Sequence, residues 1–415
     1  MSASSTTGGR ESLSPWSLEG LRLRLDSPVA AYYILLGAST LLVTFGLVMV
    51  LSASSVTSYQ ESGSSYTVFR TQAMYAAIGL VVAVIASRVS VPWWKRLALP
   101  AFFAALVLQL LVFSPLGNSV KGNRNWLAVG GFSMQPSELG KVALVLVGAL
   151  VLTRKRKLLA HMGHALVPFV PMAAGLMALV LLGHDLGTVL VLLTIAAGIL
   201  FVAGLRVRVF VVPAVIAAIG VLILVKTSDN RMGRVDAWLG TCADQGRPEC
   251  YQKVHGLYAL ADGGWWGLGI GESREKWDWL PEAHNDFIFA IIGEELGLPG
   301  TLIVVGLYAA LAFAAYRIIT RSSDFFVRLA TAGIMVWIVT QAMINIGSVT
   351  GLLPIIGVPL PLVSAGGSAM VTTMLALGML VSFARHDPAC RAALEARPSL
   401  IRRSLAVLPL RKENS

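Results

Sequence analysis

The sequence predicts an all-α polytopic membrane protein with about ten transmembrane helices. The chain of 415 residues is 56% hydrophobic and only 13% charged, whereas a soluble domain carries roughly 25% charged residues. Apolar runs that approach the ~20 residues needed to cross the hydrocarbon core recur between polar breaks. Basic residues gather at alternate breaks, as expected of a chain that crosses a membrane repeatedly.

Ten apolar runs are predicted as spans. They cover residues 30–52, 70–87, 97–114, 137–152, 165–182, 186–204, 209–226, 286–318, 326–347 and 367–384. Very little separates the fifth from the sixth, around His184 and Asp185, which predicts a tight hairpin. We therefore expect one transmembrane domain over 30–384, an N-terminal tail over 1–29 with no visible signal peptide, and a C-terminal tail over 385–415.

The basic residues set the orientation. Clusters of them fall in breaks on one side of the predicted bundle, namely Arg88, Lys95, Arg96, Arg154 to Lys157, Arg206, Arg208, Arg317, Arg321 and Arg328, and the C-terminal tail adds Arg402 and Arg403. By the positive-inside tendency this side, with both termini, is the cytoplasm. In a soluble protein the net charge of +11 would suggest nucleic acid, but here it is read as a topology signal, and no nucleic-acid partner is expected.

The opposite side receives residues 53–69, 115–136, 227–285 and 348–366. The stretch 227–285 forms a large extracytoplasmic loop between the seventh and eighth spans. It also carries Arg231, Arg234, Arg247 and Lys253, which is weak counter-evidence, because long loops translocate largely regardless of charge.

Ionisable residues converge on this outer side, and such residues at membrane depth usually mark function. The stretch LPEAHNDFIFAIIGEELG (280–297) places His284 and Asp286 at the mouth of the eighth span. A plain N-cap is the alternative role for Asp286. Pro299 and Gly300 are expected to kink that helix, so that its outer half is displaced from the bundle and lines a cavity.

Two neighbouring segments add charge at the same level. In QPSELGK (135–141), Glu138 suits the first helical turn, and Lys141 lies three residues on, which suggests contact with an anion or a structural ion pair. The preceding loop, Gly117 to Phe132, carries Lys121, Arg124 and Trp126. Its arginine is suited to a diphosphate and its tryptophan to a sugar, although membrane anchoring is commoner for tryptophan.

The last span begins with a glycine-rich turn. In PLPLVSAGGS (359–368), backbone N–H groups at the helix start favour anions, which makes Ser364, Gly366, Gly367 and Ser368 candidate binding residues; a purely geometric turn is the alternative. Cys242 and Cys250 share the large loop and are suited to a disulfide if that loop is extracytoplasmic, or remain two free thiols. No metal-ligand spacing stands out.

Together these segments resemble the SEDS family of bacterial cell-wall proteins. The matching pieces are GNRNWLAVGGFSMQPSELGK (122–141), HDLGT (184–188), LYALADGGWWGLGIGES (257–273), LPEAHNDFIFAIIGEELG (280–297) and GVPLPLVSAGGSAM (357–370). They occur in the family's order and cover about 30–384. The LPEAH start and the IGEELG ending resemble the FtsW division branch more than RodA.

The resemblance implies a peptidoglycan glycosyltransferase of the cytoplasmic membrane that polymerises lipid II on its outer face during septal wall synthesis. It implies a class B penicillin-binding transpeptidase and other divisome membrane proteins as partners. The family's catalytic aspartate corresponds to Asp286, which we assign as general base, and its Glu and Lys to Glu138 and Lys141. Lys141 and Arg124 are expected near the diphosphate, with His284 and Asp185 also binding substrate.

Departures and alternatives remain. Asn285 stands where the family usually has Thr, Ala365 where it usually has an aromatic residue, and the Cys242/Cys250 region is unusual. A divalent cation such as Mg²⁺ is compatible with the chemistry but not demanded by it. The alternatives are a lipid II flippase, a RodA-like elongation polymerase, and a scaffold that only recruits the transpeptidase.

Overall fold

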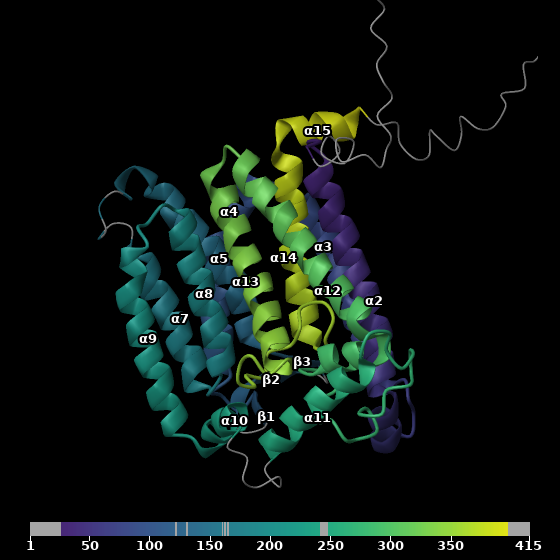
Figure 1. The fold of residues 1–415 in the computed structure, drawn as a ribbon. Helices are drawn as coiled ribbons and strands as arrows, with labels where there is room; N and C mark the ends of the chain where they lie inside the picture. The colour runs from purple at the N-terminus through teal and green to yellow at the C-terminus, as the bar shows by residue number, and fades with distance from the viewer. Residues whose placement is uncertain are drawn as a thin grey trace, which may run out of the picture.

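The computed structural model describes residues 26–120, 123–129, 132–159, 161, 163, 166–240 and 248–396. These residues form a bundle of long helices (Figure 1). The bundle comprises α2 (Ala30–Ser62), α3 (Thr67–Arg88), α4 (Val91–Leu111), α5 (Pro136–Arg154), α7 (Phe169–Leu182), α8 (Leu186–Val202), α9 (Arg208–Lys226), α12 (Ile288–Arg321), α13 (Phe325–Val349) and α14 (Gly367–His386).

Each of the ten predicted spans coincides with one of these helices. Eight of them are long and apolar enough to cross a membrane, and α7 and α8 are shorter apolar helices of 14 and 17 residues. The expected hairpin is present, because α7 ends at Leu182 and α8 begins at Leu186. The polytopic membrane fold is therefore confirmed.

Two features at one end of the bundle were not predicted. A three-stranded antiparallel sheet is formed by β1 (Gly117–Val120), β2 (Asn123–Val129) and β3 (Phe132–Met134), in the order β1-β2-β3, and it adds one small β element to the helical fold. The large loop also contains α10 (Asp229–Leu239) and α11 (Pro248–Gly263). Only two residues, both glycine, separate β2 from β3, and such a pair between short strands is a hairpin signal.

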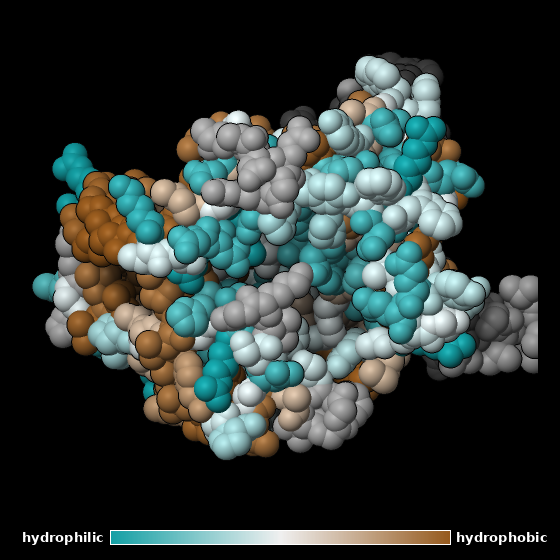
Figure 2. Space-filling view, turned by 90° about the horizontal axis from the view of Figure 1, so that it is seen from below, coloured by the Kyte–Doolittle hydropathy of each residue, from teal (hydrophilic) through white to brown (hydrophobic). Residues whose placement is uncertain are grey.

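The two ends of the bundle differ in kind. The end that carries the sheet, α10 and α11 is called here the sheet end; the opposite end carries the turn η1 (Arg156–Leu158) and the short helix α15 (Pro388–Glu395) (Figure 1). Seen from the sheet end, hydrophilic residues occupy the middle of the surface, and hydrophobic residues gather at its left edge (Figure 2). Polar groups thus concentrate over the centre of the bundle at this end.

The core of the bundle is built around α5, α13 and α14, the most buried spans. α5 packs against α4, α8 and α13, and α14 packs against α2 and α3. At the edge of the bundle, α9 buries none of its residues, as expected of a helix that faces lipid on most of its circumference. The residues of α5, α13 and α14 at the sheet end are therefore the ones held most rigidly.

The helix α12 is interrupted, as the sequence predicted, but at Gly297 rather than at Pro299. Gly297 has φ 64° and ψ −157°, a conformation that is essentially confined to glycine. The expectation that the outer half is displaced from the bundle is wrong. Residues 288–295 are all buried, because α11 and α2 pack against α12.

Several sequence-based predictions lie outside the described residues. They concern residues 1–25 of the N-terminal tail, residues 397–415 of the C-terminal tail, Lys121 and Cys242.

Candidate active site

Asp286 lies just before α12, and its main chain is anchored to α13. The N-cap position of α12 belongs to Phe287, so the simple N-cap role does not describe Asp286. The side-chain amide of Asn345 donates to the carbonyl oxygen of Asp286 at 2.8 Å and to the carbonyl oxygen of Val358 at 2.9 Å. One buried amide therefore ties the start of α12 to the segment that precedes α14.

The two residues before the aspartate are held by that same segment. The N–H of Ala365 donates to the carbonyl of His284 at 2.9 Å, and the hydroxyl of Ser364 donates to the carbonyl of Asn285 at 2.6 Å. The Ser364 hydroxyl also accepts from the N–H of Leu360 at 2.8 Å. Three consecutive carbonyls are thus fixed from outside, so the backbone that carries the carboxylate is well ordered.

Arg234 of α10 lies beside Asp286. Its Nη1 donates to the carbonyl of Ile356 at 3.2 Å. A Cβ built on Gly357 would lie 3.6 Å from this Nη1 and 3.5 Å from Oδ2 of Asp286. The guanidinium and the carboxylate therefore flank the same glycine, whose φ of 81° favours that residue type. Nothing in the sequence pattern pairs Arg234 with Asp286, since the helix that carries the arginine was not predicted.

Glu138 and Lys141 form a buried ion pair in the first turns of α5. The Lys141 ammonium lies 2.8 Å from Oε1 of Glu138, and the two side chains are 2% and 4% exposed, respectively. The ammonium also donates to Oε1 of Gln341 at 3.0 Å and lies 4.8 Å from the ring centroid of Trp337. The other oxygen of Glu138 accepts from the hydroxyl of Thr372 at 3.2 Å. Protein groups therefore surround the ammonium.

One face of α13 connects this ion pair to the aspartate. This face carries Trp337, Gln341 and Asn345, which are spaced four residues apart and therefore share one side of the helix. Each is separated from the next by about 6 Å along the helix axis. The Trp337 indole N–H donates to Oε1 of Gln341 at 2.8 Å, and Nε2 of Gln341 donates to the carbonyl of Pro359 at 2.9 Å. The polar Gln341 and Asn345 inside an apolar span were the missed sequence signal.

Asp185 joins α8 to the start of α5. As the N-cap of α8, it accepts from the N–H of Thr188 at 2.9 Å and from the Thr188 hydroxyl at 2.7 Å. It also accepts from Nε2 of Gln135 at 2.9 Å. These contacts describe a helix cap and an interhelix brace, and they use both carboxylate oxygens within the protein.

Arg124 caps the end of α4. Its Nε donates to the carbonyl of Val112 at 3.1 Å, and its Nη2 donates to the carbonyls of Phe113 and Ser114 at 3.3 and 3.0 Å. Carbonyls at a helix C-terminus lack intrahelical partners, so a cation is favourable there. In this structure the hydrogen bonds of Arg124 go to backbone carbonyls at the end of α4, whereas its position in the chain suggested a contact with a diphosphate.

Side chains of α3 pack against the glycine-rich start of α14. The N–H of Gly366 donates to Oε1 of Gln72 at 3.0 Å, and a Cβ on Gly367 would lie 2.4 Å from the ring of Tyr75. The hydroxyl of Ser368 accepts from the N–H of Gln135 at 3.4 Å. Close helix packing therefore explains Gly367, and the Gly366 N–H is already donated within the protein.

Glu294 and Glu295 hold the loop that follows α11. Glu294 accepts from the hydroxyl of Ser273 at 2.5 Å and from the N–H of Arg274 at 2.7 Å. Glu295 accepts from the hydroxyl of Ser52 at 2.6 Å, and its Oε1 lies 3.4 Å from the ammonium of Lys276. Both acids therefore dock the loop against α12 and α2, away from the Asp286 carboxylate.

The structure describes two of the three cysteines, and it also bears on possible metal ligands. Cys250 is disulfide-bonded and Cys390 is free, while Cys242 lies outside the described residues, so the predicted Cys242–Cys250 pairing stays a prediction. In the part of the chain that the structure describes, no group of three His, Cys, Asp or Glu side chains is arranged to hold a metal.

The model of the FtsW/RodA/SpoVE family of cell cycle proteins matches residues 32–388. The chain belongs to this family. A relative named probable peptidoglycan glycosyltransferase FtsW, from Mycobacterium tuberculosis, is 41% identical over 373 residues, which cover 90% of this chain and 71% of that protein. Stage V sporulation protein E of Bacillus subtilis is 35% identical over 350 residues, covering 84% and 95% of the two chains.

Solved structures of this family share the fold. A chain from work on the structural coordination of polymerization and crosslinking by a peptidoglycan synthase complex superposes with a TM-score of 0.70 at 25% identity, covering 85% of this chain and 97% of that one. RodA, the rod shape determining protein of Thermus thermophilus, gives 0.62 at 25% identity, with 85% and 96% covered.

Proposed function

We propose that this member of the FtsW/RodA/SpoVE family is a peptidoglycan glycosyltransferase that polymerises lipid II, with Asp286 as its general base. The observation that carries this proposal is the anchoring of residues 284–286. Three consecutive carbonyls are fixed by α13 and by the segment before α14, which holds one carboxylate at the sheet end beside an arginine. A fixed acid beside a cation suits a reaction that moves a proton and releases an anion.

The reaction lengthens a glycan by one glycosidic bond. A sugar hydroxyl attacks the anomeric carbon of a lipid-linked sugar, the bond from that carbon to the diphosphate breaks, and the lipid diphosphate leaves with its electron pair. The carboxylate of Asp286 takes the proton of the attacking hydroxyl. General base catalysis of this kind contributes typically about 10²–10⁴-fold to the rate.

Arg234 is the cation best placed to stabilise the leaving diphosphate. Its Nη1 and Oδ2 of Asp286 lie 3.6 and 3.5 Å, respectively, from the position that a Cβ would take on Gly357, and a guanidinium binds phosphate oxygens in a bidentate manner. Lys141 and Arg124, which the sequence placed near the diphosphate, give their hydrogen bonds to protein groups in this structure. Lys141 therefore supports the site through Gln341, and Arg234 takes the role of direct contact.

The sheet end faces the outside of the cytoplasmic membrane in this proposal, and both termini lie in the cytoplasm. The basic residues at the opposite end of the bundle support this orientation through the positive-inside tendency. The names of the relatives support a role at the division septum, where a class B penicillin-binding transpeptidase and other divisome membrane proteins would be partners. A structural relative that belongs to a peptidoglycan synthase complex supports the transpeptidase.

Polymerisation of labelled lipid II by the purified protein with its transpeptidase tests the assignment. We expect glycan chains from the wild type and none from Asp286→Asn. The matched control is Asp262→Asn, which changes an exposed acid paired with Arg274 and should leave polymerisation intact. Normal polymerisation by Asp286→Asn would exclude Asp286 as the base.

The same samples separate the alternatives. A flippase would scramble labelled lipid II across liposomes without making polymer, and a scaffold would show neither activity. Labelling of a cysteine introduced at Glu282, which precedes Asp286 by four residues, tests the orientation. Modification by an impermeant reagent from the periplasmic side is expected, and modification only from the cytosol would contradict the proposed topology.

A further inference from the structure

The loop after α11 supplies hydrogen bonds to backbone groups at the interruption of α12. At this break the N–H of Leu298 donates to the carbonyl of Gly264 at 3.2 Å, and Pro299 has no N–H to offer to Glu295. Instead, the N–H groups of Leu268 and Gly269 donate to the carbonyls of Glu294 and Glu295, both at 2.9 Å. The segment 264–269 therefore lies against the backbone of α12 at the level of the interruption.

Glycines allow this close approach. A Cβ on Gly297 would lie 2.5 Å from the nitrogen of Gly267 and 2.8 Å from the carbonyl oxygen of Trp265. A Cβ on Gly263 would lie 1.9 Å from the carbonyl oxygen of Gly293. Because no side chain separates the two backbones, the position of Trp265 along α12 is fixed at the level of Gly297.

The length of α12 beyond its interruption matches the thickness of a hydrocarbon core. From Gly297 to Arg317, near the opposite end of the bundle, a helix rises about 30 Å, which is the thickness of the core. Residues 288–295 of α12 are buried, whereas Leu302 and Ile303 beyond Gly297 are 58% and 55% exposed. The apolar exposed face of α12 thus begins where the loop meets it.

A second helix places the boundary at the same height. The apolar part of α2 ends at Ser52, after which the helix continues to Ser62 with the polar sequence ASSVTSYQES. Ser52 donates to Glu295 at 2.6 Å, two residues from the interruption of α12. The change from apolar to polar in α2 and the break in α12 are therefore at one level of the bundle.

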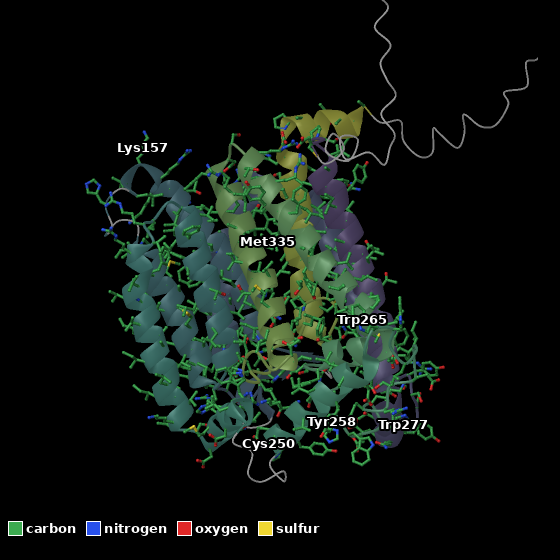
Figure 3. All side chains as sticks on the ribbon, viewed as in Figure 1. Lys157, Cys250, Tyr258, Trp265, Trp277 and Met335 are labelled. Carbon is green, nitrogen blue, oxygen red and sulfur yellow. The ribbon has the colours of Figure 1, made fainter. Side chains whose placement is uncertain are left out.

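Two exposed tryptophans stand at this level. Trp265 and Trp266 are 73% and 85% exposed, and the nearby Ile270 is 63% exposed. Trp265 projects from the flank of the bundle, whereas Tyr258 and Cys250 lie nearer the extreme sheet end (Figure 3). Tryptophan is enriched where the hydrocarbon core meets the headgroups, because its ring is apolar while its N–H is polar.

We propose that Trp265 and Trp266 insert into the outer headgroup boundary of the bilayer and fix the depth of the interrupted helix. The occupant of this surface is the lipid itself. Because residues 288–296 continue without interruption toward Asp286, the anchor also sets the height of the carboxylate above the membrane. This last consequence rests on the proposed function, whereas the anchoring does not.

Trp277 and Trp279 provide an internal comparison. They are 63% and 56% exposed, but they belong to the polar part of the loop, where the Trp279 ring stacks on His255. Trp277 lies beyond Trp265, toward the sheet end (Figure 3). Two exposed pairs of tryptophans in one loop thus differ mainly in their depth.

Fluorescence quenching by brominated lipids in proteoliposomes tests the proposal. The signal of Trp265 and Trp266 is the difference between wild type and the double variant Trp265→Phe/Trp266→Phe. We expect lipids brominated near the headgroup to quench this difference signal more than lipids brominated deep in the chain. The difference signal from Trp277→Phe/Trp279→Phe should be quenched by neither.

Two results would overturn the anchor: equal accessibility of both tryptophan pairs to brominated lipid, or no lipid quenching of Trp265 and Trp266. An unchanged melting temperature of each double variant in detergent ensures that the comparison concerns folded protein. The measurement does not depend on polymerase activity, so it stands even if Asp286→Asn were to polymerise normally.

Discussion

Asn345, buried in α13, donates from its side-chain amide to the backbone carbonyl of Asp286 at 2.8 Å. It lies about two helical turns from Trp337, which packs on the buried ammonium of Lys141. Asp286, assigned as the base, and Lys141 of the buried ion pair therefore both contact the same face of α13.

Replacing Asn345 with alanine should lower polymerase activity while the protein stays folded. The variant loses the hydrogen bonds to Asp286 and to Val358, and a displacement of about 1 Å at a reacting group can cost roughly 10²-fold in rate. We expect the loss in kcat, with KM little changed. The matched control is Thr350→Ala, since the Thr350 hydroxyl donates only to carbonyls of its own helix. Equal activity of the two variants would contradict the positioning role.

Changing Lys141 alone should destabilise the protein, whereas changing both partners should not. Lys141→Met leaves the carboxylate of Glu138 buried without its cation, which typically costs about 3–5 kcal/mol. In Glu138→Gln/Lys141→Met no charge is buried, so the melting temperature should return toward that of the wild type. We expect polymerisation to return with it. Recovered stability without activity would instead show that Lys141 acts on the substrate.

Gly297→Ala should destabilise the protein through its backbone. The φ of 64° with ψ of −157° is strained for alanine by about 1–3 kcal/mol, and the new methyl would press on the nitrogen of Gly267. Gly306→Ala is the control on the same helix, because nothing lies within 4 Å of a Cβ there, and alanine is favoured in a helix by about 0.8–1 kcal/mol. Thermal melting in detergent should move in opposite directions for the two variants.

Because of Glu275, the stability of the folded protein should fall as the pH rises above 4.5, the ordinary pKa of a glutamate side chain. Burial raises the pKa of this carboxyl above 4.5, and the hydrogen bond with His255 offsets part of the rise. Between 4.5 and the raised value, the folded protein holds a proton that the unfolded chain has released, so rising pH removes stability. Glu275→Gln should flatten this decline in melting curves taken between about pH 4 and pH 7. Parallel curves for the two proteins would refute the prediction.

The disulfide is tested by counting thiols in denatured protein. Without reductant, an alkylating reagent should modify one cysteine per chain, Cys390, which is free. After reduction it should modify all three cysteines of the sequence. Three modified cysteines without reductant would exclude the pairing of Cys242 with Cys250.

Local residue chemistry accounts for much of what could be predicted about the site. Asp286, Glu138 and Asp185 stand out as ionisable groups in an apolar chain, and the structure places all three at the sheet end. The distant partners of Asp286 and Glu138 were not predictable, because Asn345 and Thr372 come from helices far away in the chain. Arg234 was missed since its helix, α10, is polar and gives no hydropathy signal.

The sequence by itself determined the number and position of the spans, because the bilayer requires long apolar segments whatever their neighbours are. It also predicted where the apolar part of α2 ends, at Ser52, although not where the helix ends, since a helix can continue into water. Only the tertiary structure decided that α12 breaks at Gly297 while its outer half stays buried. That outcome depends on backbone contacts with residues 264–269, which a pattern along the chain does not contain.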